Sequence, residues 1–210
     1  TPQQKRVAAG FFNSMDPQAI SSDQAFSTTG LAGYEDSSRW FGVLDGARYR
    51  IEVPANWNGM LVMYAHGFRT TDNSRLYVDS PPMRRYLLDN GYAWAASSYS
   101  TNFYDVRTGV EDTNALALAF TDIAANNGRT LETPEKYYIT GVSMGGHVTA
   151  AAIEKETKET ANNVVNYSGA APMCGVVGDT ELFNFFAGYT ISLVGIAESP
   201  SAFTFPLSPS

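Results

Sequence analysis

Residues 137–147, with the sequence YYITGVSMGGH, constrain the fold of this chain more than any other stretch. An apolar, β-prone segment breaks there into a Gly-x-Ser-x-Gly turn, and an alanine-rich helix is expected at residues 148–155. This order predicts a strand, a sharp turn and a helix, with Ser143 at the apex of the turn. Gly141 and Gly145 must lack side chains in so tight a turn, and the serine takes a strained backbone conformation that raises its hydroxyl above the sheet edge.

Ser143 is therefore a candidate nucleophile, placed to attack a carbonyl carbon. The backbone N–H of Met144, at the start of the following helix, points to where negative charge would develop, and so supplies one oxyanion donor. The motif alone is weakly specific in a chain with 18 glycines, but its strand and helix context favours the nucleophilic role. The alternative is an ordinary glycine-rich turn capped by serine.

Composition indicates a globular protein and narrows its partners. The 210 residues are 44% hydrophobic and 17% charged, which fits one domain of ordinary size. The formal net charge is −7 and no run of lysine or arginine is long enough to follow phosphates, so nucleic acid is not an expected partner. We expect no membrane span, and because the chain begins at Thr1 we expect a secreted or periplasmic protein.

The sequence shows no cofactor site and cannot form an internal disulfide. Neither a cluster of metal ligands nor a phosphate-binding glycine loop is visible, so we expect no metal and no organic cofactor. Cys174 is the single cysteine of the chain and cannot form an internal disulfide. We expect it to be a small buried thiol, with a disulfide to another chain as the alternative.

The order of the remaining elements predicts a mostly parallel sheet covered by helices on both faces. Residues 1–38 are expected to form an irregular extension, followed by a hairpin around Asp45-Gly46 that supplies an antiparallel edge. Strands and helices then alternate, as in doubly covered sheets. The predicted strands lie at 60–65, 92–99, 137–142 and 164–171, and the predicted helices at 82–90, 110–125 and 148–155. The sequon at Asn166 falls in a strand predicted to be buried, so we expect it to be unmodified.

A second feature follows the buried strand at residues 60–65. The strand leads into His66-Gly67-Phe68 and then a polar loop. A strand that ends in His-Gly-x supplies the second oxyanion donor of hydrolases built on this plan, here the N–H of Phe68. Phe68 also places an aromatic wall beside the acyl group. The alternative is a simple strand-to-loop turn at Gly67.

Together these motifs resemble the N-terminal portion of the α/β-hydrolase fold family, over residues 39–172. The resemblance implies a serine hydrolase of the esterase or lipase type, and the strand ending at Ala171 would be the sixth of eight. In that family the catalytic order is serine, then aspartate or glutamate, then histidine. The chain has only His66 and His147, and no histidine follows His147. We expect His66 to hold its loop by hydrogen bonds and His147 to project from the helix flank.

Three interpretations of the missing catalytic histidine stay open. The favoured one is that a second polypeptide or a C-terminal fragment supplies the acid, the histidine and the last two strands. The second is a degenerate hydrolase fold that binds without catalysis. The third is a nonstandard base such as a lysine, which Lys136 and Lys155 do not fit because they lie outside a Ser-x-x-Lys spacing.

An aromatic helical segment at residues 178–189 and 191–196 is too apolar for a free surface. The resemblance implies a cap inserted after the sixth strand, so residues 173–210 are expected to begin such a cap or lid. Asp179 is a candidate triad acid, with an N-cap role as the alternative. The aromatic residues of this segment either line a pocket for an apolar acyl or aryl group or are ordinary core residues. They are Phe183, Phe186, Tyr189 and Phe203.

The sequence thus predicts an enzyme that cleaves small-molecule carboxylic esters through an acyl-serine intermediate. Ser143 attacks, and the N–H groups of Met144 and Phe68 stabilise the oxyanion. A serine peptidase or amidase on the same scaffold and a non-catalytic binding protein are the alternatives, because the fold and motif serve each of them.

Overall fold

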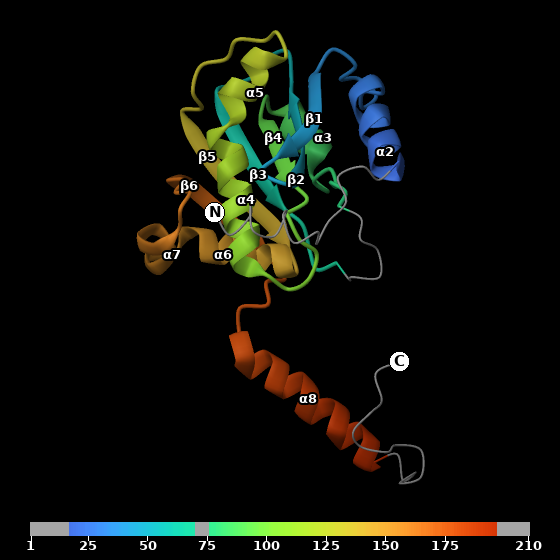
Figure 1. Cartoon of the computed structure of the whole chain (residues 1–210), viewed down its shortest axis with the longest axis vertical. Helices are drawn as coiled ribbons and strands as arrows, with labels where there is room; N and C mark the ends of the chain where they lie inside the picture. The colour runs from blue at the N-terminus through green and yellow to red at the C-terminus, as the bar shows by residue number, and fades with distance from the viewer. Residues whose placement is uncertain (1–16, 70–75, 197–210) are drawn as a thin grey trace. The chain divides into compact units, whose positions relative to one another are not determined.

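The computed structural model describes residues 17–69 and 76–196 of the chain. The chain divides into two units, one ending at Gly175 and one beginning at Val176, and each is described by itself. In the described part of the first unit, six strands form one sheet in the order β1-β2-β4-β3-β5-β6 (Figure 1). The strands are β1 (Ser38–Leu44), β2 (Ala47–Val53), β3 (Met60–Ala65), β4 (Ala93–Ser97), β5 (Lys136–Val142) and β6 (Tyr167–Met173).

The sheet is mostly parallel, as the sequence predicted. β3 pairs in parallel with β4 and β5, and β5 pairs in parallel with β6. β1 and β2 are antiparallel and join the sheet through an antiparallel β2–β4 pairing. Their turn has Asp45 at φ 48° and Gly46 at φ 89°, the left-handed pair that a two-residue hairpin requires. The predicted hairpin and the antiparallel edge are therefore confirmed.

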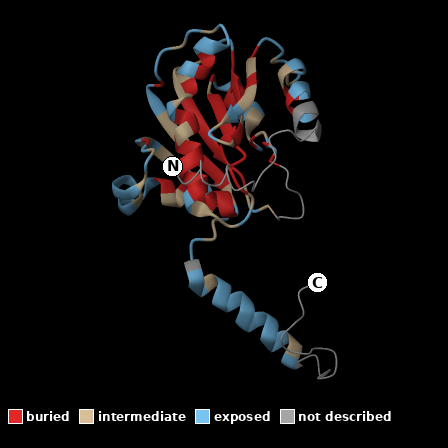
Figure 2. Cartoon of the chain, in the orientation of Figure 1, coloured by how far each residue is buried: buried red, intermediate tan, exposed pale blue. Residues whose placement is uncertain are grey.

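Helices cover both faces of this sheet, which confirms the predicted fold class. The side chains of β3 alternate between the two layers. Leu61 and Met63 belong to the core beneath α4, α5 and α6. Val62 and Tyr64 pack in the core with α2 and α3. Figure 2 shows the central strands β2, β3 and β4 and the helix α4 as largely buried. The helices of this unit are α2 (Pro17–Thr28), α3 (Arg84–Asp89), α4 (Val106–Leu118), α5 (Phe120–Asn126), α6 (Met144–Ile153) and α7 (Lys155–Thr160).

The helix predicted at residues 110–125 is instead two helices, with a break at Ala119. α4 begins at Val106 because the side chain of Asp105 accepts a hydrogen bond from the Thr108 N–H. The predicted buried face is present nonetheless, since Leu116 and Phe120 are both buried in the core. The hydrophobic period located this face, but it indicated neither the cap nor the break.

The prediction of an irregular segment at residues 1–38 is wrong for residues 17–28, which form α2. Asp23 of this helix is fully buried and accepts hydrogen bonds from the Nε atoms of Arg48 (3.2 Å) and Arg50 (2.9 Å) on β2. Phe26 packs edge-on against Trp94 of β4, with ring centroids 5.6 Å apart. Tertiary contacts, and not a hydrophobic period along the helix, thus hold α2 against the sheet. Residues 1–16 lie outside the described residues.

Two expectations for the end of the unit are also wrong. β6 is the last strand in the order of the sheet, so its side chains are more exposed than those of a central strand. Asn166 precedes the strand and is exposed, not buried. Cys174 follows it, with φ 48°, and is an exposed free thiol instead of a buried one.

The second unit is described as one helix, α8 (Asp179–Ile196). The helix was expected from its aromatic sequence, and Phe183, Phe186 and Tyr189 on it are exposed. Phe203 lies outside the described residues, and the lid role of this segment stays a prediction. Within residues 17–69 and 76–196, no helix combines the length and apolar character needed to cross a membrane.

The buried ion cluster gives a first testable prediction. Asp23→Asn leaves the guanidinium groups of Arg48 and Arg50 buried without their carboxylate, and should lower the free energy of unfolding by about 3 kcal/mol in urea titrations. Glu159→Gln is the control, because Glu159 meets Lys155 in a solvent-exposed pair at 3.6 Å and should leave the midpoint unchanged. Equal midpoints for the two variants would contradict a structural role for α2.

Candidate active site

Ser143 lies at the turn between β5 and α6 in the backbone conformation that the motif predicts. Its φ is 59° and its ψ is −123°, a region that side-chain-bearing residues rarely occupy, and the residue is exposed. The turn is fixed from both sides. The Ser143 N–H donates to the Met173 carbonyl oxygen (3.0 Å), and the Ser143 carbonyl accepts from the N–H groups of Gly146 (2.9 Å) and His147 (3.2 Å).

Glycines let the elbow approach the neighbouring strands at backbone contact. A Cβ atom on Gly145 would lie 2.0 Å from the carbonyl oxygen of Ala65 at the end of β3. A Cβ on Gly141 would lie 2.3 Å from the carbonyl oxygen of Gly145. A Cβ on Gly146 would lie 2.6 Å from the Met173 carbonyl oxygen at the end of β6. No side chain fits at these positions, so the glycines specify how closely α6 packs on β3, β5 and β6.

The loop after β3 lies directly beside the serine. A Cβ on Gly67 would lie 3.5 Å from Ser143 Cβ and 4.0 Å from Ser143 Oγ. The next residue, Phe68, is half exposed, whereas Met144 is buried as the first residue of α6. The first N–H groups of a helix have no intrahelical acceptor. Because Gly67 contacts Ser143, the neighbouring residues Phe68 and Met144 lie on either side of this contact in the structure. The catalytic roles of Phe68, Ser143 and Met144 stay predictions.

His66 is buried and joined to two strands. Its Nδ1 lies 2.6 Å from the Gly67 carbonyl oxygen and its Nε2 lies 2.9 Å from the Ser98 carbonyl oxygen, just after β4. The ring stacks on Tyr99 with centroids 3.9 Å apart, and the Tyr99 hydroxyl donates to the His66 carbonyl at 2.9 Å. Tyr99 itself has φ 56°. The sequence predicted that His66 holds the loop, but it did not indicate that Tyr99 closes the other side.

Burial keeps the His66 imidazole neutral. Desolvation, helped by the positive charge of Arg69, lowers the pKa of His66 to about 4, and the two carbonyl contacts oppose this shift without reversing it. A neutral imidazole has one N–H, so only one of its two carbonyl contacts is a hydrogen bond at neutral pH. His66 is thus a positioning group whose ring nitrogens both face backbone.

His147 lies one turn along α6 from Ser143. Its Nδ1 lies 2.9 Å from the hydroxyl of Tyr104, and the two ring centroids are 5.9 Å apart. Tyr104 comes from the polar loop before α4. The sequence placed His147 on the helix flank but did not identify Tyr104 as its partner, because the two are far apart in the chain.

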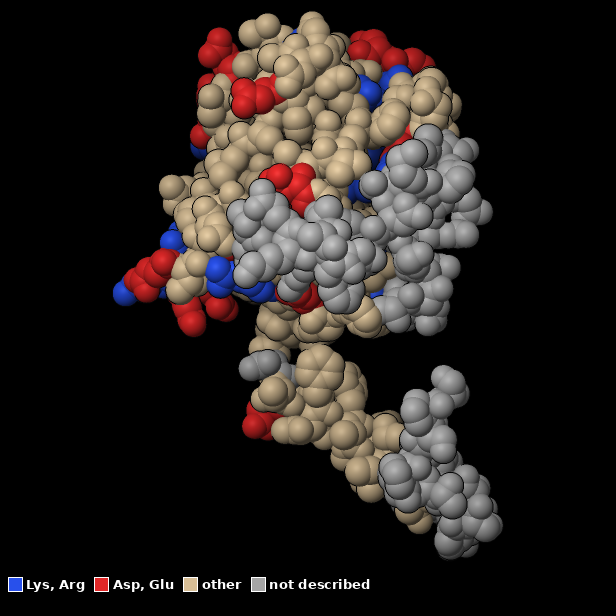
Figure 3. Space-filling view, in the orientation of Figure 1, with Lys and Arg blue, Asp and Glu red and all other residues tan. Residues whose placement is uncertain are grey.

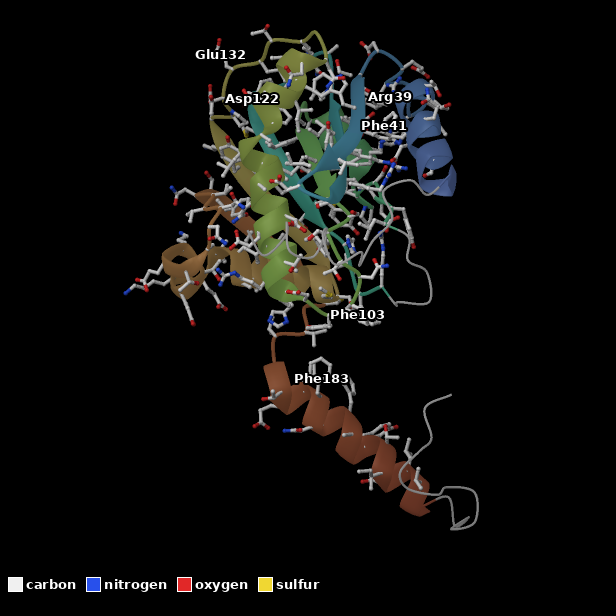
Figure 4. The ribbon with its side chains drawn as sticks, viewed as in Figure 1. Arg39, Phe41, Phe103, Asp122, Glu132 and Phe183 are labelled. Atoms are coloured by element: carbon white, nitrogen blue, oxygen red, sulfur yellow. The ribbon has the colours of Figure 1, made fainter. Side chains whose placement is uncertain are left out.

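These groups gather where the parallel strands end. Figure 4 shows Phe103 at the end of the core where α4 begins, and Asp122 and Glu132 at the opposite end. On the face drawn in Figure 3, basic and acidic side chains are interspersed. Within the described ranges, no three His, Cys, Asp or Glu residues are placed to hold a metal ion. The mostly parallel sheet, the turn at Ser143 and the loop after β3 thus meet at one end of the described core.

Comparisons with known proteins give distant likenesses only. Esterase B from Lactobacillus rhamnosis is 21% identical, with a TM-score of 0.43, and the match covers 80% of this chain and 56% of that one. The rice cell wall degrading esterase LipA from Xanthomonas oryzae is 16% identical, with a TM-score of 0.45, over 61% of this chain and 38% of that one. An esterase from Pseudomonas putida is 15% identical, with a TM-score of 0.40, over 76% and 48%.

The chain thus spans about half the length of the esterase B structures. No protein-family model matches the chain, and no curated protein matches it either. Likenesses this distant leave the function to be argued from the site.

The buried histidine gives a pH prediction. Between pH 6.5 and about 4 the unfolded chain binds a proton at His66 and the folded chain does not, so stability should fall as pH drops through this window. The full shift corresponds to about 3 kcal/mol. His66→Gln should flatten that part of the stability–pH curve in denaturant titrations, and His147→Gln should retain it. An unchanged slope in His66→Gln would show that His66 is not the buried neutral group.

Proposed function

We propose that the chain is the N-terminal portion of a serine hydrolase that cleaves carboxylic esters through an acyl-serine intermediate. The observation that carries this proposal is the strained, exposed Ser143, with φ 59° and ψ −123°. Three glycines in backbone contact hold this conformation. Backbone strain of this kind costs about 1–3 kcal/mol and persists where the surrounding structure enforces it, most often at functional sites.

In the proposed mechanism Ser143 Oγ attacks the ester carbonyl carbon, and the N–H groups of Met144 and Phe68 stabilise the oxyanion. The serine proton passes to a histidine and from it to the departing alcohol, which leaves an acyl-serine. Water then attacks the acyl carbon and gives a proton to the histidine. The bond between the acyl carbon and Ser143 Oγ breaks as the histidine passes this proton to Oγ, which releases the acid and restores the serine. The mechanism uses no metal and no cofactor.

The proposed histidine and its acid come from a second polypeptide or from a C-terminal part beyond this chain. His66 is a poor candidate for the base because both of its ring nitrogens face backbone carbonyls. His147 is a poor candidate because its Nδ1 contacts the Tyr104 hydroxyl and its ring leaves the helix one turn beyond the serine. Asp179 stays a candidate acid by its position in the sequence alone.

The sheet offers a place for such a part. Within residues 17–69 and 76–196, β6 pairs with β5 alone, which leaves an unpaired strand edge there. Beside it lies an apolar hollow of about 450 Å³ between α3, β5 and β6. The residues that line the hollow include Met83, Tyr86, Leu87, Tyr138, Ala170 and Ala171. We propose that the polypeptide carrying the histidine covers this hollow and extends the sheet.

The nucleophile is tested with a fluorophosphonate probe on the full polypeptide that carries this chain. We expect covalent phosphonylation at Ser143, located by peptide mass spectrometry, and a loss of at least a thousandfold in ester hydrolysis in Ser143→Ala. Ser168→Ala is the control, since Ser168 is an exposed serine on β6 outside the elbow. Absence of labelling at Ser143 would contradict the proposal and favour a binding protein.

A matched pair of charged variants tests whether the polypeptide that carries the histidine covers the hollow beside β6. Ala171 on β6 and Ala125 on α5 are both exposed in this structure, but only Ala171 lines the hollow. If polypeptide covers the hollow, Ala171→Glu buries a charge and should lower the unfolding free energy of the full polypeptide by about 2 kcal/mol or more, whereas Ala125→Glu should change it by less than about 0.5 kcal/mol. Equal small effects would place the completing part elsewhere.

A further inference from the structure

Two exposed phenylalanines lie on the loops beside the elbow. Phe68 is 50% exposed and Phe103 is 52% exposed. The Phe103 N–H donates to the carbonyl oxygen of Arg69 at 3.1 Å, so the backbone of Phe103 is tied to the residue that follows Phe68. Phe103 has φ 81°, a conformation that non-glycine residues rarely adopt. The chain thus holds this aromatic side chain outward at a strained position (Figure 4).

Two further rings continue this surface. Phe68 and Tyr104 have ring centroids 6.4 Å apart with an interplanar angle of 34°. Tyr104 and His147 have centroids 5.9 Å apart at 56°, and the hydroxyl–Nδ1 contact of 2.9 Å fixes both rings. We call Phe68, Phe103, Tyr104 and His147 the aromatic rim. The rim draws on the loop after β3, the loop before α4, and α6.

Backbone contacts connect both ends of the aromatic rim to Ser143. Phe68 follows Gly67, where a Cβ would lie 4.0 Å from Ser143 Oγ. The N–H of His147 donates to the Ser143 carbonyl at 3.2 Å. A substrate whose carbonyl carbon sits at Ser143 Oγ therefore has its nearest substituents within reach of these rings.

The guanidinium of Arg69, the residue after Phe68, is already paired with other groups. The guanidinium of Arg69 contacts the Asp79 carboxylate and stacks over the Tyr77 ring, with Cζ 3.8 Å from the ring centroid. Its charge is paired there and is not offered to an anionic substrate group. Exposed rings next to the proposed nucleophile, with the charge of the adjoining Arg69 already paired, favour a neutral aromatic ligand over a charged one.

We infer that the aromatic rim binds an aromatic ring of the substrate, so that the preferred substrates are neutral aryl-bearing esters. This inference rests on the proposed esterase function. Aromatic pairs favour tilted or offset arrangements with centroids about 4.5–7 Å apart. Phe68 and Phe103, both exposed, supply ring surface that a substrate ring can contact. An aliphatic chain of the same size gains burial at the rim but lacks the ring–ring term.

The test compares two substrate pairs on the full polypeptide. Methyl 3-phenylpropanoate is compared with methyl 3-cyclohexylpropanoate, and 2-phenylethyl acetate with 2-cyclohexylethyl acetate, which places the ring on the acyl or the alcohol side. We expect kcat/KM for the phenyl member of at least one pair to be about three- to tenfold higher. Phe68→Leu, Phe103→Leu and Tyr104→Leu should each bring this ratio towards one.

Matched variants separate the ring from other effects. Tyr104→Phe keeps the ring and should retain the phenyl preference, while Phe41→Leu removes a half-buried ring on β1, at the far edge of the sheet, and should also retain it. The ratio of two substrates does not depend on the folded fraction, so loss of stability does not imitate the effect.

Three outcomes decide the inference. A phenyl preference that falls in the three rim variants supports it. If Ser143 is labelled by fluorophosphonate and both members of each pair are hydrolysed equally, or lose the same factor in the rim variants, the aromatic rim does not select the substrate and the esterase function stands. If Ser143 is not labelled and no ester is hydrolysed, both the function and the inference are overturned.

Discussion

Backbone contact between the elbow and the end of β3 sets the geometry on which the whole site depends. A Cβ on Gly145 would lie 2.0 Å from the Ala65 carbonyl oxygen, so α6 begins as close to β3 as two backbones can approach. This contact places Ser143 beside Gly67 without the help of any side chain. Main-chain packing is stiffer than side-chain packing, because it has no rotamers to relax. The separation between the nucleophile and the loop that follows β3 is therefore a property of the fold.

The loop itself is fixed from the opposite direction by β4. His66 reaches the Ser98 carbonyl oxygen, and Tyr99 returns a hydrogen bond to the His66 carbonyl while stacking on its ring. Burial raises the pKa of Tyr99 as it lowers that of His66, so both groups stay neutral over the physiological range. The ends of β3 and β4 are thus joined by neutral contacts, which salt does not screen.

Local chemistry explains which parts of this structure the sequence could predict. The left-handed pair Asp45-Gly46 and the glycines around Ser143 specify their turns within a few residues, so the hairpin and the elbow were predictable. Burial and pairing between distant segments could not be predicted in this way. Asp23 holds α2 through arginines of β2, and Tyr104 meets His147 across 43 residues of sequence. The exposure of Cys174 depends on β6 being an edge strand, which no pattern around the cysteine reveals.

The difference between local backbone conformation and contacts of distant residues also applies to the chemistry proposed for this chain. The hydroxyl proposed as nucleophile and the N–H proposed as oxyanion donor at the start of α6 both depend only on backbone conformation. A general base needs an unprotonated nitrogen lone pair within reach of the serine proton. Both ring nitrogens of His66 face backbone carbonyls, and Nδ1 of His147 contacts the Tyr104 hydroxyl. A hydroxyl without a base is a weak nucleophile at neutral pH. The proposed acyl-serine chemistry therefore needs a further imidazole. The end of β6 touches the turn at Ser143, since the Met173 carbonyl accepts a hydrogen bond from the Ser143 N–H.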